Sequence, residues 1–310
     1  MLTVQKSMTQ TVRSLTVQSL IGRFLFIPVL FSLNSVVNAQ SPQPYPTDGA
    51  VDTSMHLSCR WNSANYQPYS ELNRWFVGRV RQGFADPRQC DLSTRVSTNY
   101  YVCNWNGYNY QPYNFFDNIE IGQAYYGFRN QADCDATVKS SWNSFVCNWN
   151  GSGFTAYTKN GTNIGRPHYG YQNFQDCQST VRSSRPDLIC NWNGTNHQVY
   201  DVRFNRPIGY DGYGHNRLSD CNITVQTAGA EFVCQWTGQG YSPYVIFSNQ
   251  AVGGLFNSFN NLADCTMATS ASRRGSICAL SNGRYSIYSS RDPQYGYGSY
   301  ISLRECTRDL

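Results

Sequence analysis

The chain has 310 residues, of which 15% are aromatic and only 14% are charged, and its formal net charge is +5. The positive charges of Lys6, Arg13 and Arg23 lie in an N-terminal stretch without acidic residues, so removal of residues 1–39 leaves a net charge of +2. Because nucleic-acid binding requires a clustered basic surface, this small charge argues against a nucleic-acid partner.

The N-terminal segment has the pattern of an export signal. Basic residues precede an apolar run over residues 24–33, and Val37 and Ala39 supply the small side chains that a signal peptidase needs. This run is shorter than the roughly 20 apolar residues that span a bilayer. We therefore predict a signal peptide over residues 1–39, cleaved near Ala39, and a secreted, periplasmic or cell-surface protein without a membrane span in its mature chain. An uncleaved membrane anchor is the alternative.

The mature chain divides into a leader and a repeat domain. Residues 40–58 contain proline and serine and match no later segment, so we expect a flexible leader. From residue 59 to 310, the gaps between consecutive cysteines alternate between 13 residues and 28 to 31 residues. This periodicity predicts one repeat domain of six tandem units of about 44 residues. The predicted units are 59–102, 103–146, 147–189, 190–233, 234–277 and 278–310.

The cysteines of an exported chain are expected to form disulfides. There is no CxxC pair, and the four histidines share no ligand spacing, so we expect neither a metal site nor a cofactor. Pairing within units would use all 12 cysteines. Pairing each unit's second cysteine with the next unit's first explains why the gap of 13 never varies, because a helix followed by a returning strand brings the two sulfurs level.

We favour the second disulfide scheme, which leaves the first and last cysteines to close the units into a ring. An open stack with within-unit bridges is the alternative. The favoured pairs are Cys90–Cys103, Cys134–Cys147, Cys177–Cys190, Cys221–Cys234, Cys265–Cys278 and Cys59–Cys306.

In chain order, the sequence of each unit predicts three strands followed by a helix. Residues 144–149 are rich in strand-forming side chains and lead into Asn150-Gly151, which predicts a hairpin turn. The second strand carries a tyrosine ten residues after the first cysteine, and a proline in it, such as Pro112, predicts a sheet edge. Residues 121–128 predict a third strand.

A capping pattern predicts that the second cysteine of each unit lies in a helix. A small polar residue such as Asn130 occupies the N-cap, and a glutamine or an acidic residue such as Asp133 occupies position N3 of a capping box. Only unit four departs from this, with Arg217 at the cap. The fold class is therefore an α+β repeat of β-β-β-α units, each too small to be stable without its neighbours and its disulfides.

Most recurrent side chains have a structural interpretation. Capping explains the recurrent carboxylates, and an active site is normally assembled once, so we expect no enzyme. In units one to five, the tryptophan two residues after the first cysteine shares the face of that cysteine, so we expect it in the core rather than on a ligand.

The tyrosines are the predicted contact residues, because exposed tyrosine offers a rigid ring and a hydroxyl. Tyrosines that merely cover the core are the alternative. The candidate ligand-binding residues are Tyr113, Tyr126, Tyr157, Tyr169, Tyr200 and Tyr213. We expect a lectin-like protein that binds glycan, or another cell-envelope polymer, through many weak sites on surfaces rich in Tyr, Asn and Arg. A structural envelope or matrix protein that self-associates is the alternative function.

Overall fold

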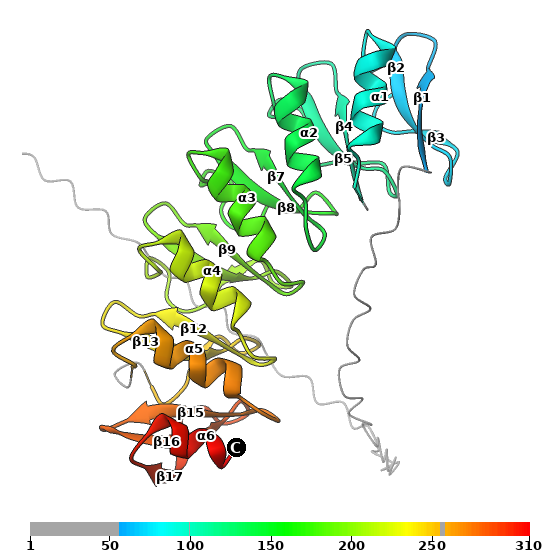
Figure 1. Ribbon diagram of the computed structural model, residues 1–310. Helices are drawn as coiled ribbons and strands as arrows, with labels where there is room; N and C mark the ends of the chain where they lie inside the picture. Colours follow the sequence, from blue (N-terminus) through cyan, green and yellow to red (C-terminus); the bar gives the residue numbers. More distant parts are fainter. Residues whose placement is uncertain (1–55, 99, 255–257) are drawn as a thin grey trace, which may run out of the picture. The chain divides into compact units, whose positions relative to one another are not determined.

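The computed structural model describes residues 56–98, 100–254 and 258–310 (Figure 1). These residues form six repeating units of antiparallel sheet and helix, as the sequence predicts, and each unit contains one disulfide. The predicted signal peptide, and the leader as far as residue 55, lie outside the described residues. The first strand begins at Leu57, so the first unit starts two residues before its first cysteine.

Each unit begins with a hairpin of two strands paired in full register. The first strands are β1 (Leu57–Trp61), β4 (Tyr101–Trp105), β7 (Phe145–Trp149), β9 (Leu188–Trp192), β12 (Phe232–Trp236) and β15 (Ser276–Ser281). The second strands are β2 (Tyr66–Ser70), β5 (Tyr110–Asn114), β8 (Phe154–Thr158), β10 (His197–Asp201), β13 (Tyr241–Val245) and β16 (Arg284–Ser289).

A short third strand and a helix complete the unit. The third strands are β3 (Trp75–Phe76), β6 (Ile119–Glu120), β11 (Arg206–Pro207), β14 (Gln250–Ala251) and β17 (Gly296–Tyr300). Unit three has only an isolated bridge, between Tyr157 and Asn163, in this place. The helices are α1 (Pro87–Arg95), α2 (Gln131–Lys139), α3 (Phe174–Ser183), α4 (Leu218–Gln226), α5 (Leu262–Ala271) and α6 (Leu303–Arg308).

The predicted third strand was placed too late in the chain, and the second strand is not at an edge. β6 covers only Ile119–Glu120, and residues 121–128 form a loop that returns where Phe128 bridges Tyr110. β5 lies between β4 and β6. Its Pro112 accepts a backbone hydrogen bond from Ile121, and β6 has already ended there, so the missing proline N–H costs no ladder bond.

The turns and caps follow the sequence prediction closely. The hairpin turn of unit three is a four-residue loop in which Asn150 Oδ1 accepts the N–H groups of Ser152 and Gly153. Gly151 in it has a φ of +95°, which glycine adopts without strain. The predicted N-cap side chains accept hydrogen bonds from the first turn in five helices, and Arg217 makes no such bond in α4.

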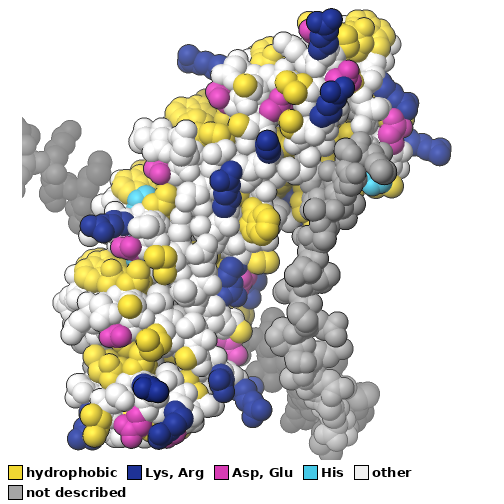
Figure 2. Space-filling model, viewed as in Figure 1, with side chains coloured by type: hydrophobic (Ala, Val, Ile, Leu, Met, Phe, Trp, Pro, Cys, Tyr) yellow, Lys and Arg dark blue, Asp and Glu magenta, His cyan; other side chains and the backbone are white. Residues whose placement is uncertain are grey.

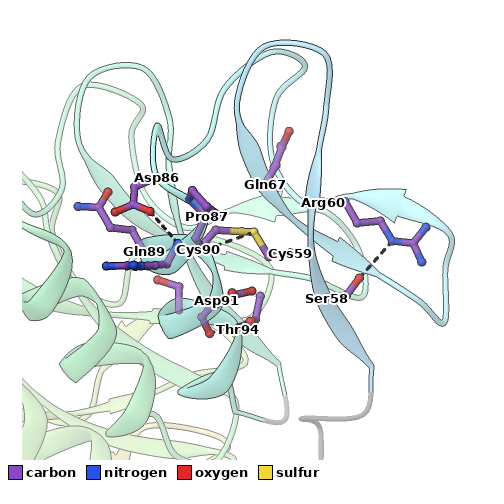
Figure 3. Close-up of a disulfide and its surroundings, with 12 residues drawn as sticks. Ser58, Cys59, Arg60, Gln67, Asp86, Pro87, Gln89, Cys90, Asp91 and Thr94 are labelled. Carbon is purple, nitrogen blue, oxygen red and sulfur yellow. Dashed lines mark hydrogen bonds between the residues drawn. A yellow bond between two sulfur atoms is a disulfide. The ribbon is translucent and has the colours of Figure 1, made fainter.

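The disulfides lie within units, which corrects the favoured scheme, and Figure 3 shows the bridge of unit one. The bridges are Cys59–Cys90, Cys103–Cys134, Cys147–Cys177, Cys190–Cys221, Cys234–Cys265 and Cys278–Cys306, with Cα atoms 5.7 to 6.0 Å apart. None of the predicted pairs Cys90–Cys103, Cys134–Cys147, Cys177–Cys190, Cys221–Cys234, Cys265–Cys278 and Cys59–Cys306 is formed.

The physical reason for the correction is the direction in which a strand side chain points. In both schemes the two cysteines of a pair can lie level along the helix axis. Successive residues of a strand, however, face opposite sides of the sheet, so a strand cysteine can reach the helix on one side only. Cys103 faces α2 of its own unit, whereas Val102 packs toward Val77 of unit one. The covalent argument for a closed ring therefore fails, since Cys59 and Cys306 are both bonded within their own units.

Each of the inner sheets is covered on both faces. Helix α1 packs against β1 and β2 of its own unit and against β4 of the next, and the later helices repeat this arrangement. As a result, residues 101–104 in β4 are all buried, although their side chains alternate between the two faces. This explains why the first strands read as nearly continuous apolar runs.

A buried asparagine after the first cysteine joins successive units. Its side-chain N–H donates to a backbone carbonyl of the preceding unit, and the glycine after that carbonyl has a positive φ. A Cβ on this glycine would come within 2.7 Å of the asparagine Nδ2. The bonds are Asn104 to Val77 at 2.8 Å, Asn148 to Ile121 at 2.7 Å and Asn191 to Ile164 at 2.6 Å.

The outer face of unit one carries charged side chains in place of this interface. Arg60 stands where unit two has the buried Asn104, and Glu71 stands where it has the buried Phe115. Arg60 forms an ion pair with Glu71 at 2.7 Å, and its guanidinium lies 4.0 Å from the ring centroid of Tyr69. Repeat proteins use such polar end units to keep their terminal faces in water.

Candidate functional site

The six predicted contact tyrosines separate into a buried set and an exposed set. Tyr113, Tyr157 and Tyr200, ten residues after their first cysteines, are 1 to 3% exposed and pack between units. Burial raises the pKa of Tyr157 and Tyr200 to about 12. Their proposed place on a contact surface was therefore wrong. They do face away from the disulfide, but the preceding unit covers that face.

Tyr126, Tyr169 and Tyr213 lie at the surface, with 39 to 47% of each side chain exposed. Each comes from the loop before a helix, and its ring lies over the turn glycine of the next unit. A Cβ on Gly151 would approach the Tyr126 ring to 2.8 Å, and one on Gly194 would approach the Tyr169 ring to 2.6 Å. These glycines let the aromatic ring approach the backbone closely, so each tyrosine is partly covered by the next unit and partly exposed.

The tryptophans are not core residues, which corrects the expectation from strand alternation. Trp61 is 56% exposed, and Trp105, Trp149, Trp192 and Trp236 are half-buried. Each is the last residue of its strand, directly before the hairpin turn. Strand alternation predicts the face of the sheet on which the tryptophan lies, but it does not predict how much of the side chain is buried.

Each tryptophan is held edge-on by the ring that pairs with it across the hairpin. The ring centroids are 4.9 to 5.1 Å apart in units one to five, and the partners are Tyr66, Tyr110, Phe154, His197 and Tyr241. Such edge-to-face pairs are favourable for aromatic rings. In units two to five the partner ring in turn contacts an aromatic residue of the preceding unit, as in Phe128 to Phe154 at 6.1 Å. The tryptophans therefore pack on a row of partly buried rings.

We call this surface the aromatic edge and define it by two kinds of side chain, one from each of two adjoining units. Figure 2 shows hydrophobic side chains gathered at intervals along one edge of the visible face, with polar side chains between them. The aromatic edge comprises Tyr126, Tyr169, Tyr213, Trp105, Trp149, Trp192 and Trp236. Sequence reasoning missed the tryptophans, although their recurrence directly before a turn was a signal.

Between units one and two the aromatic edge opens into a cleft of about 370 Å³. Its walls include Gln82, Trp105, Gly107 and Tyr110. Gln82 stands where the later junctions have the exposed tyrosines, and its amide lies against Gly107. This junction thus has an amide side chain where the later junctions have an exposed tyrosine ring.

The acidic side chains near the aromatic edge make structural contacts. Asp133 and Asp176 occupy helix caps in which their backbone N–H groups donate to asparagine side chains, and Glu120 accepts a hydrogen bond from Asn106, the residue after Trp105. Within the described residues there is no cluster of three potential metal-ligating His, Cys, Asp or Glu side chains. No helix in the described ranges is long and apolar enough to cross a bilayer.

Comparison of the chain with protein-family models gave no match, and a search of curated proteins gave no significant match. The functional argument therefore rests on the geometry of the aromatic edge.

Proposed function

We propose that this protein is a secreted, non-enzymatic binding protein that holds a glycan or another cell-envelope polymer along its aromatic edge. The observation that supports this most is a repetition at three successive unit junctions, each of which presents an exposed tyrosine from one unit and a half-buried tryptophan from the next. A polymer presents the same chemical group at regular intervals, and a repeated site on a rigid scaffold matches it with several weak contacts at once. The avidity of such contacts can exceed each single affinity by 10² to 10⁴.

The chemistry of the edge suits a sugar ring better than a purely apolar ligand. An exposed tyrosine or indole ring packs against the apolar face of a sugar, and its hydroxyl or ring N–H remains available for a hydrogen bond. The partly exposed rings are backed by other rings and by glycine backbone. They therefore lose little conformational freedom on binding, which reduces the entropic cost of association.

The proposal is tested by pull-down of the purified mature protein on insoluble chitin, cellulose, xylan and peptidoglycan. The informative variant is Tyr126→Ala with Tyr169→Ala and Tyr213→Ala. Trp142→Ala is the matched control, because Trp142 is 56% exposed and lies in the turn between α2 and β7, outside the aromatic edge. We expect retention of the wild type on at least one polymer, strong loss by the triple variant and no change in the control.

Equal retention of the triple variant and the wild type would contradict binding through the aromatic edge. Retention of neither, together with growth of the wild-type sedimentation coefficient with concentration, would favour the alternative of a self-associating matrix protein.

A further inference from the structure

A second cavity, of about 930 Å³, lies in units four to six outside the aromatic edge. Loops that precede the first strands and loops that follow the second strands build it. The side chains that matter for its chemistry are Arg203, Glu231, Phe247, Arg274 and Arg291.

The repeat places three of these side chains in equivalent positions. Arg203, Phe247 and Arg291 each stand 13 residues after the first cysteine of their unit. Since the units stack in register, an arginine, a phenylalanine and an arginine follow one another across three consecutive units. The cavity therefore presents one such side chain per unit, and a row of this kind is suited to an extended ligand.

The charges on the wall favour an anion. The four ionised side chains of the wall carry three positive charges and one negative charge. Arg203 is held by the fully buried Asp201, with its Nε 3.2 Å from a carboxylate oxygen. Arg274 and Arg291 are exposed, and neither forms an ion pair within the described residues. Arginine binds carboxylates through two parallel hydrogen bonds, which gives these two side chains a defined partner.

The remaining groups distinguish an acidic sugar from a simple anion. Phe247 is 70% exposed and offers a ring face. Glu231 lies over Gly275, since a Cβ on that glycine would come within 3.3 Å of both carboxylate oxygens. A carboxylate beside the arginines would repel a bare anion, but it can accept hydrogen bonds from sugar hydroxyls. The set therefore combines a carboxylate-binding fork, a stacking surface and a hydroxyl acceptor.

We infer that this cavity binds the uronate residues of an acidic polysaccharide. The inference deepens the proposed polymer binding, and it rests on that proposal only in taking a polymer as the ligand. The arginine cavity would supply selection for charge, while the aromatic edge would supply contacts that do not depend on charge.

The experiment measures binding of the mature protein to polygalacturonate and to its fully methyl-esterified form, which lacks the carboxylates. The variant is Arg274→Gln with Arg291→Gln, which leaves the ion pair of Arg203 intact. The matched control is Arg95→Gln with Arg182→Gln, two exposed arginines in the last turns of α1 and α3. Thermal unfolding of both double variants verifies that each remains folded.

We expect the wild type to bind polygalacturonate at least tenfold more tightly than the ester, with an affinity that falls as NaCl is raised. The cavity variant should lose this preference, and the control should keep it. Equal losses in both double variants would show a response to net charge alone and would overturn the inference, as would equal affinity of the wild type for acid and ester. Failure of the aromatic edge has a different signature, namely unchanged binding of both polymers by the variant that lacks Tyr126, Tyr169 and Tyr213.

Discussion

The side-chain amide of Asn148 donates a hydrogen bond to the backbone carbonyl of Ile121, 2.7 Å away, and so joins unit three to unit two. The same amide also donates to Gln111 Oε1 at 2.9 Å. Asn148 is completely buried, and its contacts recur at neighbouring junctions. The recurrent asparagine after the first cysteine thus has a structural cause.

Replacement of Asn148 by Leu should destabilise the protein by roughly 1–3 kcal/mol, because the Ile121 carbonyl would remain buried without this donor. Chemical denaturation of the purified variant measures the change. Asn160→Ala, at an exposed position, is the control and should have little effect. A loss no greater than that of the control would show that this junction bond is not required.

Alanine substitutions at two glycines with similar φ angles distinguish the effect of a steric clash from the effect of backbone strain. Gly165 has a φ of +84°, and a Cβ on it would come 2.6 Å from Asn191 Nδ2; Gly212 has a φ of +89° and open space around it. Alanine at either position incurs the strain of a positive φ, of about 1 kcal/mol. Gly165→Ala should be clearly more destabilising than Gly212→Ala in thermal unfolding. Equal losses would mean that the junction adjusts freely.

The capping pattern predicts that two substitutions at N-cap positions change the free energy of unfolding in opposite directions. Asn130→Ala should lower the free energy of unfolding by about 0.5–2 kcal/mol, because Asn130 Oδ1 accepts the N–H of Asp133 at 2.9 Å. In unit four, where the N-cap makes no side-chain bond, Arg217→Asn should raise it by about 0.5–1 kcal/mol. Denaturant titrations test both variants, and a stabilised Asn130→Ala or a destabilised Arg217→Asn would contradict this account of the helix starts.

His215 predicts that stability decreases in acid. It is 1% exposed, and burial lowers its pKa to about 4, against the partial opposing effects of Asp220 and Gln235. The His215 side chain therefore stays neutral in the folded protein above pH 4, whereas the same histidine in the unfolded chain gains a proton below its ordinary pKa of about 6.5. Its contribution to stability is complete above pH 6.5 and is lost as the pH falls toward 4.

The variant His215→Phe tests this contribution, because unit two has phenylalanine at the same place, at Phe128. Between pH 6.5 and 4 the variant should lose less stability than the wild type. The carboxyl of Asp135, whose pKa burial raises to about 6, contributes in the opposite direction but equally in both proteins. Parallel stability curves for the two proteins would contradict a buried neutral His215.

The charged outer face of unit one leads to a prediction about self-association. Arg60→Asn together with Glu71→Phe would recreate the residues that unit two presents to unit one. We expect this double variant to self-associate more strongly than the wild type in sedimentation velocity runs, because an apolar terminal face would be exposed. Arg88→Asn, at an exposed position of α1, is the control. Unchanged sedimentation of the double variant would mean that the ion pair of unit one does not protect this face.

Much of the fold followed from the sequence because cysteine spacing and helix caps are local signals. The six units, the helix starts and the glycine in the Asn150-Gly151 turn could all be predicted from residues close together in the chain. The disulfide partners could not, because they depend on the face that Cys103 presents once the sheets are stacked. The same limit applies to Tyr113 and Trp149. Tyr113 is buried by the preceding unit, and Trp149 stays half-buried at the last position of its strand. Strand alternation gives the face of each side chain but not how much of it the neighbouring residues cover.

The central claim is that the exposed rings of successive junctions act together on one polymer. Its most direct test is a tryptophan-fluorescence titration of the best-retained polymer, in soluble form, with variants that lack one, two or all three of Tyr126, Tyr169 and Tyr213. We predict an affinity that falls stepwise, by a similar factor for each tyrosine removed, with unchanged thermal stability. An affinity that is unchanged in the triple variant would contradict the claim.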